Sequence, residues 1–111
     1  MLLAPGLNGC KPMLIYNVTV KVETQAQDEW LEWMRQEHIP AVMRSGKFED
    51  YRICRLLHQE EDGVTYAVQY FCRDLAAMYA YQQEDAPRLQ AEHASRFSGK
   101  YVAFRTLMEI L

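Results

Sequence analysis

The order in which two hydrophobic periodicities follow one another constrains the fold of this chain more than any single residue. A period of two, carried by β-branched and aromatic residues, predicts half-buried strands at residues 14–22, 47–59, 64–72 and 101–110. Helical spacing of apolar residues predicts helices at residues 24–38, 74–84 and 87–97. Because crossover connections are right-handed, this order predicts a ferredoxin-like α+β sandwich (βαββαβ). Its four-stranded antiparallel sheet, of order 4-1-3-2, has the helices on one face.

The first helical region presents one large apolar face. Helical spacing places four residues on or beside that face: Trp30, Trp33, Met34 and His38. Pro40 is expected to interrupt the helix, and residues 39–44 are expected to add one further turn that ends at Gly46.

Pro87 divides the second helical region in the same way. Asp74 is a good N-cap for its first part, and Gly99 is expected to stop its second part. The positions expected to be buried are Leu75, Met78, Tyr79, Leu89, His93 and Phe97.

Residues 60–63 are expected to form a tight hairpin, because the Asp62-Gly63 step supplies positive backbone angles. Cys54 and Cys72 fall on the two strands of this hairpin, so a cross-strand disulfide is conceivable. Small core thiols are the preferred interpretation. Together with Cys10 they show neither a CxxC pair nor zinc-ligand spacing, so no metal site is predicted.

Composition and charge argue against several classes of protein. The 111 residues suffice for one domain, and an apolar share of 50% excludes a disordered chain. A net charge of −3 argues against nucleic-acid binding, and no apolar run reaches the roughly 20 residues that cross a bilayer. Residues 1–12 lack both periodicity and a signal-peptide pattern. We therefore expect a disordered extension before a domain at 13–111, in a cytoplasmic protein.

The predicted strands have one apolar face and one mixed face. The apolar face, expected to contact the helices, carries Tyr16, Val18, Val20, Val64, Tyr66, Val68, Tyr70, Val102, Phe104 and Met108. The mixed face carries Ile15, Asn17, Thr19, Ala67, Gln69, Phe71, Tyr101, Ala103, Arg105 and Leu107. A sheet face left in water is normally more polar than this, so we expect a second copy to cover it in a symmetric homodimer.

Three segments resemble one known family. They are W-x-x-W-M-x-x-E-H-I-P-x-V-M-x-S-G-x-F from Trp30 to Phe48, Y-A-V-Q-Y from Tyr66 to Tyr70, and F-R-T from Phe104 to Thr106. From residue 13 onward the chain is similar to a bacterial domain of unknown function in the dimeric α/β-barrel superfamily. The resemblance implies two ferredoxin-like sheets paired face to face. Neighbouring families there include cofactor-free quinone-forming monooxygenases, haem-degrading monooxygenases, muconolactone isomerases and stress-responsive barrels, with ligands in a cleft between sheet and helices.

His38 is the most suggestive titratable residue. Held beside the apolar helix face, its imidazole suits a general base tuned by Glu37 or another carboxylate. The alternative is a histidine that bonds the carbonyl groups freed at the helix break.

The other candidate ligand-binding residues also have structural interpretations. Tyr16, Tyr66 and Tyr70 either line a pocket or pack as core aromatics. Arg105, expected beside Asn17 on the mixed face, either clamps a carboxylate or enolate oxygen or pairs across the dimer interface.

His93 is similar in position to a histidine that flanks the haem of the haem-degrading relatives, in which an asparagine on the first strand, like Asn17, also takes part. The tryptophan expected around the third strand is absent, since Tyr70-Phe71 stands there. We therefore predict no cofactor. The alternative for His93 is a partly exposed helical residue.

The sequence thus predicts a small homodimer that binds a small organic ligand between helices and sheet. The first alternative is a structural or regulatory interaction module without catalysis. The second is a cofactor-free monooxygenase or isomerase with His38 as base.

Overall fold

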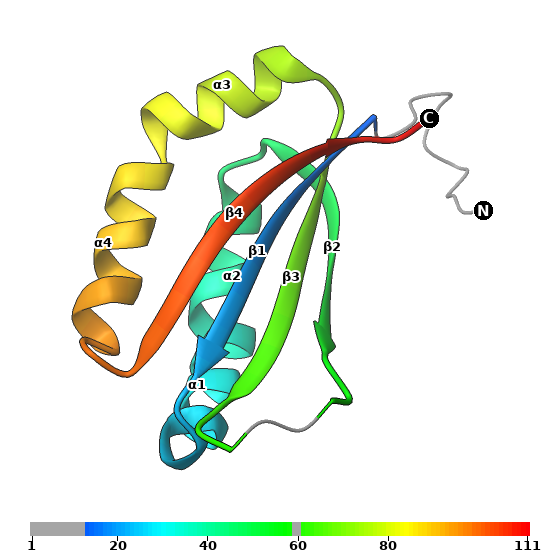
Figure 1. Cartoon of the computed structure of the whole chain (residues 1–111). Helices are drawn as coiled ribbons and strands as arrows, with labels where there is room; N and C mark the ends of the chain where they lie inside the picture. Colours follow the sequence, from blue (N-terminus) through cyan, green and yellow to red (C-terminus); the bar gives the residue numbers. More distant parts are fainter. Residues whose placement is uncertain (1–12, 59–60) are drawn as a thin grey trace.

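The computed structural model describes residues 13–58 and 61–111 and confirms the ferredoxin-like fold (Figure 1). Its strands are β1 (Leu14–Val22), β2 (Phe48–Arg55), β3 (Val64–Cys72) and β4 (Tyr101–Glu109). All three pairings are antiparallel, and the sheet order is β2-β3-β1-β4, as predicted. The extension expected at residues 1–12 lies outside the described residues.

The helices form two regions of the chain. The first runs through η1 (Thr24–Ala26), α1 (Gln27–Trp33), η2 (Met34–His38) and α2 (Ile39–Arg44), and the second comprises α3 (Leu75–Glu84) and α4 (Ala86–Arg96). Trp30 of α1 contacts the Tyr66 ring and His93 of α4 stacks on the Tyr101 ring, so both regions cover one face of the sheet. Within residues 13–58 and 61–111, no helix is long and apolar enough to cross a membrane.

The first helical region continues through the predicted break. Pro40 has no N–H to donate, and its ring would clash with the carbonyl of a regular α-helix. The backbone instead widens into a π-helical turn at η2, in which the N–H of Ile39 donates to the carbonyl of Met34, five residues earlier. His38 is the last residue of this turn, so the widened backbone determines where its imidazole lies.

The faces of β4 are opposite to the prediction. Val18 lies opposite Arg105 in the register, so Arg105 shares the helix-facing side of the sheet with Val18 rather than the outer side with Asn17. Val102 and Phe104 lie on the outer side, where they are 68% and 63% exposed. Apolar residues occur at both the odd-numbered and the even-numbered positions of this strand, and only its pairing with β1 decides which set points toward the helices.

Three local expectations about α3 and the cysteines are wrong. Leu75 and Tyr79 are 50% and 61% exposed, while Tyr81 is buried, because apolar residues surround α3 and define no single stripe. Cys54 is exposed rather than in the core. Cys72 is buried but lies opposite Phe48, far along the strand pair from Cys54, so no disulfide joins them.

The other expectations for the second region are confirmed. The Asp74 carboxylate caps α3 by accepting from the Ala77 N–H at 2.9 Å. Leu89, His93 and Phe97 are buried, and Gly99 ends the helical region with a φ of +73°.

The connection between β2 and β3 is longer than predicted. β2 ends at Arg55, so residues 56–63 separate the two strands. Gly63 does not have the positive φ of a tight two-residue turn. Its hydrogen is needed for another reason, because a Cβ at this position would lie 2.8 Å from the backbone oxygen of Val22.

This close approach predicts that Gly63→Ala lowers the free energy of unfolding by about 1–3 kcal/mol, since backbone must move to admit the methyl group. Urea denaturation at pH 7 measures the loss. Gly46→Asn is the matched control, because Gly46 has a φ of +77° and open space around it, and asparagine tolerates that backbone conformation. Equal losses in both variants would contradict the prediction.

Candidate functional site

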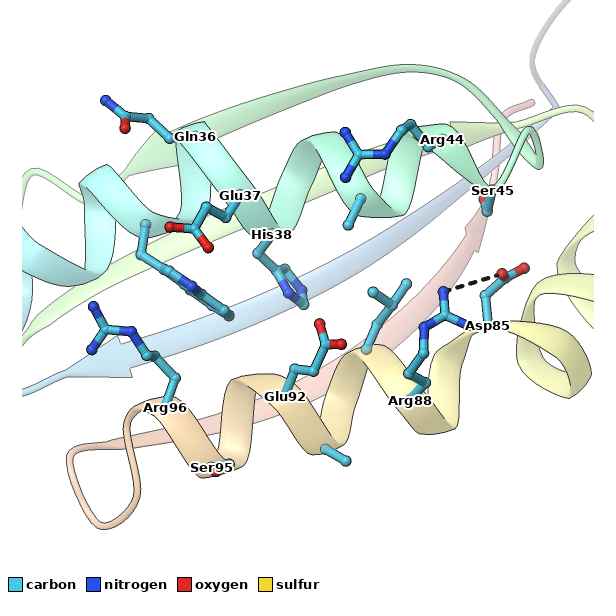
Figure 2. Close-up of a pocket in the computed structure, with 14 residues that line it drawn as sticks. Gln36, Glu37, His38, Arg44, Ser45, Asp85, Arg88, Glu92, Ser95 and Arg96 are labelled. Atoms are coloured by element: carbon cyan, nitrogen blue, oxygen red, sulfur yellow. Dashed lines mark ion pairs between the residues drawn. The ribbon is translucent and has the colours of Figure 1, made fainter.

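An open groove of about 1020 Å³ runs between the first helical region and α4 (Figure 2). Glu37, His38 and Arg44 line it from one side, and Arg88 and Glu92 line it from the other. The groove therefore has charged walls of both signs, with the His38 ring between them.

A small cavity of about 20 Å³ lies between the helices and the sheet next to this groove. His38 and Leu89 line both spaces. The polar residues around the cavity are Tyr16, His38, Tyr70, Tyr81, Gln90, His93 and Arg105. This volume accommodates about one or two water molecules but not a whole organic ligand.

The structure brings together five of the seven predicted site residues: Tyr16, His38, Tyr70, His93 and Arg105. Sequence reasoning missed Tyr81 and Gln90. Tyr81 follows the buried Met78 by three positions, and this helical spacing could have indicated that Tyr81 is buried too. Nothing in the sequence indicated that Gln90 lines the cavity.

Tyr66 and Asn17 lie outside the cavity. The Tyr66 hydroxyl donates to the Gln27 side chain at 2.7 Å, and its ring packs on Trp30 with centroids 4.8 Å apart. Asn17 lies on the outer face of the sheet, where it accepts from Gln69 at 3.1 Å and donates to Thr19 at 2.9 Å. The expected neighbours Asn17 and Arg105 are thus on opposite sides of the sheet.

His38 has an unsatisfied nitrogen. Its Nδ1 atom is buried and has no hydrogen-bond partner among the described residues, so this nitrogen does not bond the carbonyl groups freed at the helix break. The ring stacks on Trp33 with centroids 5.0 Å apart. Burial, assisted by the charge of Arg105, lowers the pKa of His38 to about 4.

His93 is held more tightly. It is 3% exposed, and its Nε2 atom accepts a hydrogen bond from Trp30 Nε1 at 2.9 Å. Its ring stacks on Tyr101 with centroids 4.2 Å apart and planes 4° from parallel. Burial, then His38 and Arg105, lowers the pKa of His93 to about 4. The His38 and His93 rings, 5.3 Å apart, are therefore both neutral at pH 7.

Arg105 supplies the cavity with positive charge. The structure records no ion pair between Arg105 and a carboxylate in residues 13–58 and 61–111. Burial raises the pKa of Tyr16, and the charge and hydrogen bond of Arg105, with a hydrogen bond from Gln90, oppose that rise. The arrangement suits an oxygen atom that carries negative charge.

The residues do not fit the haem arrangement of the haem-degrading proteins. Asn17 and His93 are on opposite sides of the sheet, so they cannot flank one planar ligand within a subunit. The Nε2 atom of His93 already accepts a hydrogen bond from Trp30, so it is not available to bind iron. The cavity beside it, of about 20 Å³, is far too small for a haem.

Residues 13–111 match the DUF4286 family, described as a domain of unknown function, and the chain belongs to this family. No curated protein matches the sequence. The fold is similar to those of known structures in the dimeric α/β-barrel group.

Three solved structures illustrate the likeness in fold. A dimeric ferredoxin-like protein from an uncultured marine organism is 10% identical, with a TM-score of 0.63, over 91% of this chain and 97% of that one. HapK from Hahella chejuensis is 15% identical, with a TM-score of 0.67, over 89% and 93%. The haem-degrader MhuD from Mycobacterium tuberculosis, with two haems in its active site, is 19% identical, with a TM-score of 0.65, over 88% and 95%.

The two buried imidazoles predict a stability loss in mild acid. Their pKa values of about 4 lie below the 6.5 of an ordinary histidine, so the unfolded chain binds more protons between these pH values. The free energy of unfolding should fall by up to about 1.4 kcal/mol per pH unit for each histidine as the pH drops from 6.5 to 4. Urea midpoints across this range measure it. His38→Gln should reduce the slope by roughly half, and an unchanged midpoint from pH 6.5 to 5 would refute the assignment.

Proposed function

We propose that this member of a family of unknown function binds a small organic ligand in the cleft between its helices and its sheet. The observation that carries the proposal is the buried Nδ1 atom of His38, which lacks a hydrogen-bond partner among the described residues, on a side chain that lines both the groove and the cavity. A buried polar atom without a partner costs about 1–3 kcal/mol, and a bound ligand would remove that cost.

The dimensions of the two spaces suggest how the ligand is divided between them. The cavity of about 20 Å³ suits one polar headgroup in place of water, and the groove of about 1020 Å³ suits the body of the molecule. Trp33 lines the groove beside His38, which favours a planar apolar body. Arg105 favours a headgroup oxygen with negative charge.

The binding unit in this proposal is a homodimer joined through the outer face of the sheet. Val102 and Phe104 are exposed there at successive outward positions of β4, and neighbouring large apolar side chains on one sheet face favour a covered surface. We place this homodimer in the cytoplasm, because Cys54 and Cys72 are unpaired thiols.

A second candidate is base catalysis by His38, as the first step of an isomerisation or of a cofactor-free reaction with dioxygen. The neutral imidazole with a free nitrogen favours it: His38 takes a proton from the ligand, and the electron pair moves onto the ligand oxygen beside Arg105. Burial and then the charge of Arg105 lower the pKa of His38, and a bound oxyanion would offset the second of these two causes.

The alternative without a ligand is an interaction module. Leu75 and Tyr79 are exposed one turn apart on α3, away from the outer sheet face, and this pair favours a contact with another protein.

Benzoate is a suitable first probe, because it combines a planar ring with a carboxylate. We expect benzoate at pH 7 to shift amide NMR signals around the groove and cavity, and Arg105→Met to weaken its binding at least tenfold, because the charged partner is lost. Arg35→Met is the matched control, since Arg35 is exposed on η2 and lines neither space. If benzoate leaves the spectrum unchanged at millimolar concentration, the interaction module is favoured.

If the outer face of the sheet joins two subunits, a charged side chain placed on that face should separate them. Phe104→Asp should give a monomer in light scattering at micromolar concentration, because the carboxylate would be buried without a partner. Leu57→Asp, at a position 93% exposed in the β2–β3 connection, should remain dimeric. A monomeric wild-type protein would exclude this mode of assembly.

A further inference from the structure

We propose that Trp30 fixes the protonated nitrogen of His93, so that His93 Nδ1 donates a hydrogen bond to a carbonyl or enolate oxygen of the ligand. This inference rests on the proposed ligand-binding function and names the chemical group that the cavity recognises. In this proposal Trp30 is a positioning residue, and His93 contacts the ligand.

The direction of one hydrogen bond carries the assignment. An indole N–H donates and never accepts, so the contact of 2.9 Å between Trp30 Nε1 and His93 Nε2 requires an unprotonated Nε2 atom. A doubly protonated ring would place two N–H groups against each other. The proton of His93 is therefore on Nδ1.

The packing around His93 prevents the ring from reversing. Tyr101 stacks on it with nearly parallel planes, and Trp33 and Phe97 contact it with centroids at 5.5 Å and 6.3 Å. With the side chain 3% exposed, a flip of the ring would break the hydrogen bond and leave the buried indole N–H of Trp30 without its partner.

The two imidazoles of the cavity thus differ in function. The Nε2 atom of His93, a residue of the cavity lining, accepts from Trp30. The Nδ1 atom of His38 is buried and has no partner among the described residues. Arg105, the charged residue of the cavity lining, adds a cation that also prefers an oxygen acceptor. A carbonyl or enolate oxygen satisfies the Nδ1–H of His93, whereas no hydrogen bond of the described residues fixes whether Nδ1 of His38 donates or accepts.

The tautomer of His93 can be measured without any ligand. We expect long-range ¹⁵N–¹H spectra at pH 7 to show the proton on Nδ1 of His93 in the wild-type protein. Trp30→Phe keeps the ring that packs on Tyr66 but removes the N–H, so a proton should appear on Nε2. Trp33→Phe, which removes an indole that is not bonded to His93, should leave Nδ1 protonated. A proton on Nε2 in the wild-type protein would overturn the proposal.

Two ligands of nearly equal shape, one with a carbonyl oxygen and one without, test whether the cavity recognises that oxygen. Acetophenone carries a carbonyl oxygen where α-methylstyrene carries a methylene group. We expect the wild-type protein to bind acetophenone about fivefold more tightly, a ratio typical of one hydrogen bond, and we expect His93→Phe and Trp30→Phe to bring the ratio close to one. Circular dichroism would establish that each variant is folded.

The outcomes separate this inference from the function on which it rests. Equal affinity of the wild-type protein for the two ligands would overturn the role of His93 and leave ligand binding intact. If acetophenone, α-methylstyrene and benzoate all fail to bind, the proposed function is wrong and the ligand role of His93 is wrong with it. The tautomer spectra would still decide the role of Trp30.

Discussion

The hydrogen bond from Trp30 to His93 joins the two helical regions that cover the sheet, and the orientation of one imidazole of the cavity depends on it. The residues are 63 positions apart in the chain, and both are almost completely buried. Loss of either partner would leave a polar atom unpaired in an apolar core, at a cost of about 1–3 kcal/mol. The same bond joins α1 to α4, so the packing of the two helical regions and the orientation of the His93 ring have a common cause.

The cavity contains polar groups but no carboxylate. Two neutral imidazoles, three phenol groups and one guanidinium surround a space the size of one or two water molecules. Such a lining stabilises negative charge on a bound oxygen and offers it no repulsion. The carboxylates of Glu37 and Glu92 line the open groove instead, where water screens them (Figure 2).

The sequence was informative wherever one periodicity dominated. β1 alternates cleanly, so its inward set, including Tyr16, was predictable, as was the buried face of α4 with His93. β4 is apolar at both parities, so the side of Arg105 depended on pairing with β1, which no local pattern encodes. Pro40 predicts an interruption of the regular helix, but the π-helical turn that accommodates it is a cooperative response of the backbone. Gln90 reaches the cavity only through tertiary packing.

The reversed parity of β4 has a mechanical consequence. Phe104 and Arg105 are neighbours in the chain, yet the pleat directs them to opposite surfaces of a single layer. Any tilt of this edge strand that moves Arg105 also moves Phe104 on the other side, because a planar peptide unit joins their two Cα atoms. The two residues thus couple the two surfaces of the sheet within a single strand, with neither a hinge nor a loop between them.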